Sequence, residues 1–161
     1  MTVVFAGLSG TLLGCLTTEE RNPYVDIESY DIVVIEDFSG HESGYEFSER
    51  FAKELSQFGP FERVLRMKPD ARAIRIRGEI TTHEKGNPAL RARYGRNIGN
   101  ARFGAMAYLE DYETGEFIAS LKVYESYSRE PSHRQRIHQS IETLIKRAAR
   151  QLAEEVSNPD L

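Results

Sequence analysis

The sequence predicts an α/β (α+β) sandwich, a mixed sheet of about five strands with two helices on at least one face. Three observations support this fold class. Residues 30–38 are a β-branched run, residues 101–127 contain two alternating segments around a turn, and residues 45–58 and 137–156 have apolar residues at helical spacing. The order strand, helix, strand, strand, hairpin, helix favours a layered fold.

The first half of this pattern supplies a buried strand and a helix. Residues 32–35, "IVVI", are apolar on both faces, which predicts a central strand. Phe47, Phe51 and Leu55 recur at near-helical spacing, and Gly59-Pro60 is a stop signal. A short strand follows at 61–68, then a strand within 71–83 with one apolar and one charged face. We expect residues 84–100 to form a long loop.

The second half supplies a hairpin and a helix. The turn at Glu113-Thr114-Gly115 predicts a β-hairpin. Its core face would carry Phe103, Ala105, Ala107, Leu109, Ala119, Leu121 and Val123. Its second face would carry Met106, Tyr108, Tyr112, Ile118 and Tyr124. This aromatic surface fits either an interface, with Tyr108, Tyr112 and Tyr124 as contact residues, or burial under another element. Pro131, Ser132 and Gln135 fit a capping box for the last helix.

Composition limits the chain to one domain. It has 161 residues, a net charge of -4 and one cysteine. A single cysteine excludes an intramolecular disulfide and a zinc site built on cysteine pairs. The high apolar content argues against global disorder.

The only cysteine follows an uncharged segment. Residues 1–14 have no charged side chain, and their apolar run is too short to cross a ~30 Å hydrocarbon core as a helix. Its length suits the apolar region of a signal peptide. The run ends in "LLGC", residues 12–15, which resembles the lipobox of bacterial lipoproteins. The alternative is an apolar strand or buried helix that contains a free cysteine.

The lipobox resemblance implies a division of the chain and a location. Residues 1–14 would be a signal peptide, 15–29 a lipidated Cys15 and an irregular tether, and 30–157 the single α/β domain. Two acyl chains on one cysteine anchor a protein stably. Leu16 is not the aspartate that retains lipoproteins at the inner membrane, so the resemblance favours the outer membrane, facing the periplasm.

The body of the chain has a second resemblance. It is similar to the bacterial lipoprotein family known as domain of unknown function 4410, over roughly residues 30–128. The segments that carry the likeness are "IVVIEDF" (32–38), "FAKELSQFGPFERV" (51–64), "IRGEIT" (76–81), Gly86-Asn87 with Arg91, and "AMAYLEDYETGEFI" (105–118). The resemblance implies a fold like the N-terminal domain of TolB, and it implies no activity.

The chain shows no catalytic signature. It has no Gly-x-Ser-x-Gly, no Ser-x-x-Lys and no phosphate-binding loop. His133 and His138 are five residues apart, which does not suit a helical zinc pair. Glu36 and Asp37 end the first strand, but alternation along a strand would send them to opposite faces, so that at most one enters a pocket. We therefore expect no enzyme, no metal and no cofactor.

Charge is unevenly distributed. Residues 63–102 contain eleven Lys or Arg and three acidic residues. A basic face would suit lipid headgroups, the cell wall or an acidic protein. The alternative is a solvated strand and loop neutralised by nearby acids. The candidates for this face are Arg75, Arg77, Arg91, Arg93, Arg96 and Arg102.

These observations lead to one functional hypothesis and two alternatives. The first is a membrane-anchored periplasmic lipoprotein that binds or assembles other envelope components without catalysis. Its partners would be a lipid anchor in the membrane and an envelope protein or the cell wall, with no nucleic acid. The alternatives are a lipoprotein that carries an apolar ligand, and a periplasmic hydrolase that uses Glu36 or Asp37. The sequence does not determine the oligomeric state.

Overall fold

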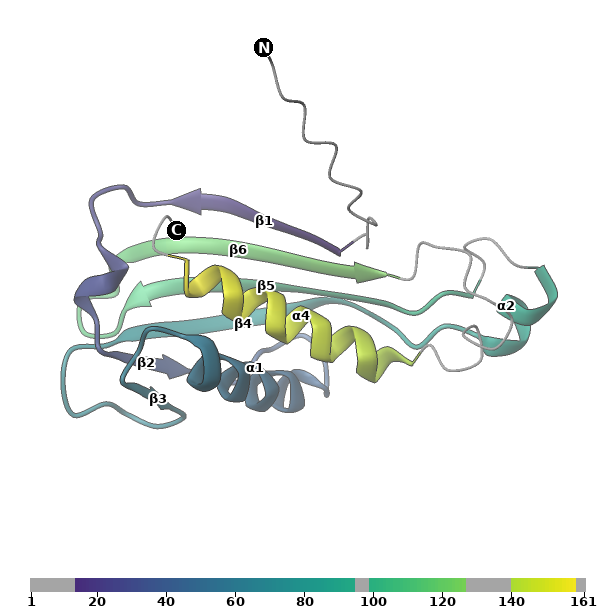
Figure 1. The fold of residues 1–161 in the computed structure, drawn as a ribbon, viewed down its shortest axis with the longest axis horizontal. Helices are drawn as coiled ribbons and strands as arrows, with labels where there is room; N and C mark the ends of the chain where they lie inside the picture. The colour runs from purple at the N-terminus through teal and green to yellow at the C-terminus, as the bar shows by residue number, and fades with distance from the viewer. Residues whose placement is uncertain (1–13, 95–98, 127–139, 159–161) are drawn as a thin grey trace, which may run out of the picture.

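A computed structural model describes residues 14–94, 99–126 and 140–158. Its centre is a six-stranded mixed sheet in the order β1-β6-β5-β4-β2-β3 (Figure 1). The strands β1, β6, β5 and β4 pair antiparallel, whereas β2 pairs in parallel with β4 and β3. The strands are β1 (Gly14–Arg21), β2 (Ile32–Ile35), β3 (Arg63–Leu65), β4 (Ile74–Glu84), β5 (Arg102–Asp111) and β6 (Phe117–Ser126). The predicted fold class is confirmed.

The sixth strand corrects the prediction for the N-terminal part. Residues 14–21 form β1 along the edge of β6, and residues 27–29 form a 3-10 helix, where we expected an irregular tether over 15–29. A register shift between Thr18 and Glu20 interrupts the pairing. The sequence pattern did not predict this strand, because the segment is polar and acidic. An edge strand can form with little hydrophobic patterning.

Two long helices lie together on one face of the sheet. They are α1 (Gly44–Phe58) and α4 (Ile141–Val156), and they pack against each other (Figure 1). Their apolar residues join those of the sheet in one core. Phe47 lies at its centre, with ring centroids 4.9 Å from Phe38 and 5.1 Å from Phe103. The core-facing residues predicted for the hairpin are all buried.

Ser140 directly precedes the first residue of α4. Ser140 caps the described helix, because its hydroxyl accepts a hydrogen bond from the Thr143 backbone N–H. The predicted capping box at 131–135 lies outside the described residues. No described helix is long and apolar enough to span a bilayer.

Two local predictions need correction. The expected loop at 84–100 contains a short helix, α2 (Pro88–Tyr94), where the side chain of Asn87 accepts hydrogen bonds from the backbone N–H groups of Ala89 and Leu90. Ile118 lies in the core and not on the second face of the hairpin. A register shift between Leu109 and Glu110 breaks the strict alternation that placed it there.

The hairpin turn is fixed to the rest of the fold by a buried carboxylate. Asp111 accepts hydrogen bonds from the Tyr30 hydroxyl (2.8 Å), from Arg72 Nε (3.3 Å) and from the backbone N–H groups of Glu113 and Thr114. The Arg72 guanidinium also lies 4.2 Å from the centre of the Tyr30 ring. These contacts join the turn to the segment that leads into β2.

Candidate functional site: the helix-free face of the sheet

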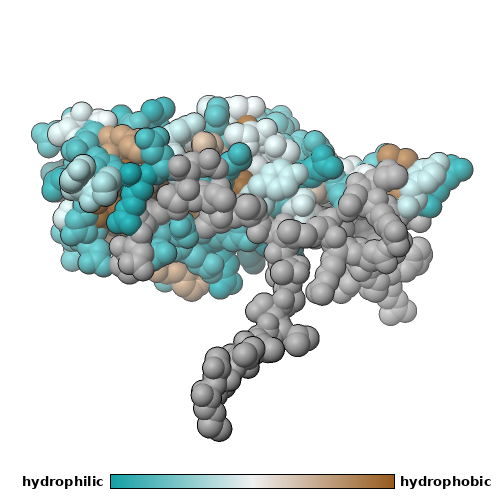
Figure 2. Space-filling view, turned by 90° about the horizontal axis from the view of Figure 1, so that it is seen from above, coloured by the Kyte–Doolittle hydropathy of each residue, from teal (hydrophilic) through white to brown (hydrophobic). Residues whose placement is uncertain are grey.

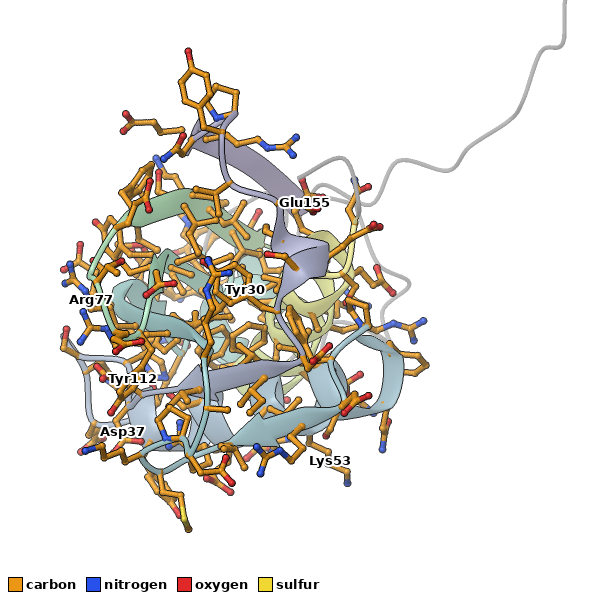
Figure 3. All side chains as sticks on the ribbon, turned by 90° about the vertical axis from the view of Figure 1, so that its left-hand side faces the viewer. Tyr30, Asp37, Lys53, Arg77, Tyr112 and Glu155 are labelled. Atoms are coloured by element: carbon orange, nitrogen blue, oxygen red, sulfur yellow. The ribbon has the colours of Figure 1, made fainter. Side chains whose placement is uncertain are left out.

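The face of the sheet opposite the two long helices carries the predicted arginines and tyrosines of β4 and β5. Ile74 and Ile76 point into the core, so Arg75 and Arg77 between them point to the opposite face. Figure 3 shows Arg77, Tyr112 and Asp37 on the side of the molecule away from α4. In the described part of the chain, no helix covers this face.

One glutamate organises the two arginines. Arg75 Nη2 donates to Glu110 Oε2 at 2.6 Å, and Arg77 donates to Glu110 Oε1 from Nη2 at 2.6 Å and from Nε at 3.0 Å. The hydrogen bonds from Arg77, and then from Arg75, lower the pKa of Glu110 although its burial opposes this. One carboxylate therefore neutralises one of the two positive charges and fixes both guanidinium groups.

The tyrosines lie beside these arginines. The Arg77 guanidinium is 5.4 Å from the centre of the Tyr108 ring, and that of Arg75 is 5.9 Å from the Tyr112 ring. The two predicted surfaces, basic and aromatic, thus form one surface. We call the group Arg75, Arg77, Tyr108, Glu110 and Tyr112 the arginine–tyrosine face.

Tyr124 lies farther along the same side of the sheet. It pairs in register with Gly104 of β5, and a side chain at Gly104 would approach the Tyr124 ring to 3.3 Å. The missing side chain of Gly104 therefore leaves room for this half-buried ring.

The six predicted arginines do not form a single basic face. Arg102 begins β5 at the far end of the sheet, 3.7 Å from Glu84. Arg91 and Arg93 belong to α2, beyond the sheet, and Arg96 lies outside the described residues. The prediction grouped residues by sequence proximity, whereas Arg75 and Arg77 lie near the start of β4 and Arg102 pairs with Glu84 at its other end.

A surface pocket lies beside the arginine–tyrosine face. It has a volume of about 420 Å³ and is lined by Glu36, Asp37, Ser39, Arg77, Gly78, Glu79 and Tyr108. Both residues of the predicted pair line it, whereas strict strand alternation would have brought only one of them to the pocket. The reason is that β2 ends at Ile35, so the alternation of a strand no longer applies to residues 36 and 37.

Arg66 forms an ion pair with one of these two acidic residues, Asp37. Its guanidinium contacts Asp37, bonds Glu49 of α1 at 3.0 Å and donates to the carbonyl oxygen of Ile35 at 2.7 Å. This bridge fixes the end of β2 to α1. Asp37 therefore has a structural partner, whereas Glu36 is exposed.

Two of the four histidines meet in space. The rings of His41 and His83 stack with centroids 3.8 Å apart, and burial followed by the proximity of His41 lowers the pKa of His83. His133 and His138 lie outside the described residues. Among the residues described, no three His, Cys, Asp or Glu side chains are grouped as metal ligands would be.

Sequence reasoning missed Glu110 and the buried Asp111. The missing signal was the register of β4 against β5, which places Arg75 opposite Glu110 and Ile74 opposite Asp111. Pairing the charged residues of β4 with the acidic end of the hairpin strand would have identified Glu110.

Comparison with known proteins shows the fold alone. No family model matches the chain, and no curated protein matches it. A dodecameric variant of PelC from Paraburkholderia phytofirmans aligns with a TM-score of 0.61 at 12% identity, over 90% of this chain and 99% of that one. A second PelC dodecamer from the same organism gives 0.53 at 16%, over 88% and 98%.

A third similar structure belongs to a family without assigned function. Protein XCC0632 from Xanthomonas campestris, of the DUF330 family, aligns with a TM-score of 0.60 at 10% identity, over 87% of this chain and 90% of that one. The resemblances to the 4410 family and to the lipobox stay predictions. The chain thus shares its architecture, over nearly its full length, with PelC and with a DUF330 protein.

Proposed function

We propose that this chain is a membrane-anchored lipoprotein of the cell envelope, on the periplasmic face of the outer membrane, that binds or assembles other components without catalysis. The observation that carries this proposal is the arginine–tyrosine face. Its two arginines are held in place at a surface by hydrogen bonds to one shared glutamate, and their guanidinium groups lie near the rings of Tyr108 and Tyr112. Arginine and tyrosine are the residue types that contribute most to protein interfaces.

The structural comparison supports an assembling role. The PelC structures are dodecamers, and this chain aligns with nearly all of each PelC chain. At this identity the likeness extends to the fold, so assembly of this chain into a ring or any other oligomer is part of the proposal. Analytical ultracentrifugation of the purified chain measures its oligomeric state directly.

The anchor is tested at Cys15. We expect mass spectrometry of the native protein to find an N-terminus at Cys15 that carries acyl chains, and Cys15→Ser to move the protein from the membrane fraction to the soluble periplasm. Two acyl chains would hold the protein in the membrane fraction, whereas one chain alone gives only marginal membrane binding. An unmodified Met1 terminus would contradict the anchor and, with it, the envelope location.

The arginine–tyrosine face is tested by a double substitution. Arg77→Ala with Tyr108→Ala should weaken recovery of crosslinked envelope partners by roughly tenfold, because paired arginine and tyrosine anchors dominate interface energies. The matched control is Arg50→Ala with Tyr45→Ala, the same two residue types on the exposed side of α1. An unchanged set of partners in the first variant would remove this face from the proposal.

Two alternatives remain testable beside this proposal. A carrier of an apolar ligand needs a cavity between sheet and helices, where the rings of Phe47, Phe51 and Phe103 occupy the space. A hydrolase would use the pocket that contains Glu36 and Asp37. The ion pair of Asp37 with Arg66 favours a structural role for that carboxylate.

A further inference from the structure

Between β4 and β5, the described residues 85–94 and 99–101 project beyond the sheet, and we call them the α2 arm. Figure 1 shows α2 past the ends of β4 and β5, away from α1 and α4. The Asn87 N–H donates to the Gly99 carbonyl oxygen at 2.8 Å, which closes the base of the arm. Gly86 and Gly99 have φ of 71° and 72°, a conformation that other residues rarely adopt. The arm therefore has specific local geometry, although it adds little to the core.

The arm presents apolar and cationic side chains together. Leu90 and Tyr94 are 39% and 55% exposed, and four residues apart they lie on the same side of α2. The Arg93 guanidinium is 5.2 Å from the centre of the Tyr94 ring. Residues 85–102 contain five Lys or Arg and no acidic residue. Figure 2 shows hydrophobic and hydrophilic atoms side by side on this projection.

The arm and Cys15 lie at the same end of the sheet. Cys15 pairs in register with Tyr124, near the end of β6. At that end Ser126 pairs with Arg102, and Arg102 pairs with Glu84, where the arm begins. A lipid on Cys15 would therefore place the bilayer on the side of the molecule from which the arm projects.

We propose that the α2 arm is a second membrane contact, which docks on anionic phospholipid headgroups. Arg93 and Lys85 would face the phosphates, and Leu90 and Tyr94 would enter the interface, as in short amphipathic basic segments. The absence of acidic residues from 85–102 gives the arm the charge complementary to such a surface. This inference rests on the proposed anchoring at Cys15 for the direction of the membrane.

The test uses the full chain with Cys15→Ser, so that no acyl chain contributes. We expect this protein to sediment with vesicles of phosphatidylglycerol and phosphatidylcholine, to bind vesicles of phosphatidylcholine alone much less, and to be released by salt. Adding Arg93→Ala with Tyr94→Ser should weaken binding about tenfold, because each basic residue near an anionic surface raises partitioning about fivefold and the ring adds apolar burial.

The matched control makes the same exchanges at the opposite end of the sheet. Tyr24 is 94% exposed and follows β1, and Arg63 begins β3, so Arg63→Ala with Tyr24→Ser should bind vesicles like the parent. Circular dichroism should give the same melting temperature for the parent and the arm variant, because α2 lies outside the core.

Three outcomes would overturn the inference. They are no binding to anionic vesicles, equal binding to neutral and anionic vesicles, and equal losses in the arm variant and the control. Loss of a protein crosslink in the arm variant without vesicle binding would assign the arm to a protein partner instead. The anchor is judged separately, because an unmodified N-terminus would contradict the lipidation at Cys15 whatever the vesicles show.

Discussion

Replacing Gly44 by alanine should lower the free energy of unfolding by more than about 3 kcal/mol, the largest loss we expect from any single methyl group in this chain. A Cβ at Gly44 would overlap the backbone carbonyl oxygen of Phe38. Backbone cannot turn aside as a flexible side chain can, so α1 would have to move away from the segment that follows β2. The helix propensity gained with alanine, about 1 kcal/mol, is too small to offset this.

The contact at Gly44 is part of a tight connection. The Gly44 carbonyl oxygen accepts from the Ser48 hydroxyl at 2.8 Å, and that hydroxyl accepts from the Phe38 N–H at 3.0 Å. The Gly44 N–H donates to the carbonyl oxygen of His41 at 3.0 Å. A displacement at Gly44 would therefore break buried hydrogen bonds as well.

Gly115→Ala is the matched control for this substitution. Gly115 has φ of 73°, and a methyl group on its Cα would have no neighbouring atom within 4 Å, so alanine there meets backbone strain alone. We expect Gly115→Ala to lower the free energy of unfolding by about 1–2 kcal/mol. Urea unfolding followed by circular dichroism compares the two variants. A Gly44→Ala protein as stable as the Gly115→Ala protein would show that α1 can shift without cost.

Removing the Asp111 carboxylate should lower the free energy of unfolding by about 2–4 kcal/mol. Asp111 is only 3% exposed, and Asp111→Ala leaves the Tyr30 hydroxyl and the N–H groups of the turn without their acceptor. The matched control is Asp70→Ala, which removes an aspartate that is 73% exposed and paired with Arg63 at 2.5 Å. Exposed pairs of this kind contribute little to stability, because water and salt screen their attraction. Equal losses in the two variants would contradict the structural role of Asp111.

The same carboxylate gives stability a pH dependence of known sign. Burial alone would raise the pKa of Asp111, but hydrogen bonds from the Thr114 backbone, the Tyr30 hydroxyl and the Glu113 backbone hold it well below its usual range. Since the folded-state pKa lies below the unfolded value of about 3.9, the contribution is complete above about pH 5 and is lost as the pH falls. Asp111→Asn should therefore lose less stability than the parent between about pH 5 and pH 2.

The parts of the fold that sequence predicted well are those where one strong local signal acts. The continuous apolar run of β2 and the spacing of Phe47, Phe51 and Leu55 each follow from burial on known faces. The edge strand β1 gave no such signal, because its stability comes from hydrogen bonds to β6. Helix α2 was missed because a seven-residue helix capped by Asn87 needs no apolar periodicity.

The candidate site was predicted in its residue types but not in its grouping. Alternation along β4 correctly turned Arg75 and Arg77 away from the core, and alternation along β5 did the same for Tyr108. Which residues meet depends on register, a long-range property that a one-residue shift inverts. Glu110 shows this most clearly, since its role exists only through its position opposite β4.

The position of Cys15 inside β1 has a mechanical consequence. Cys15 is the second residue of an eight-residue strand that is hydrogen-bonded to β6, so hardly any free chain separates it from the sheet. An acyl group on Cys15 would be attached directly to the folded domain and not through a flexible linker. The whole domain would then be held close above a bilayer, with the end of the sheet that carries Cys15 nearest to the headgroups.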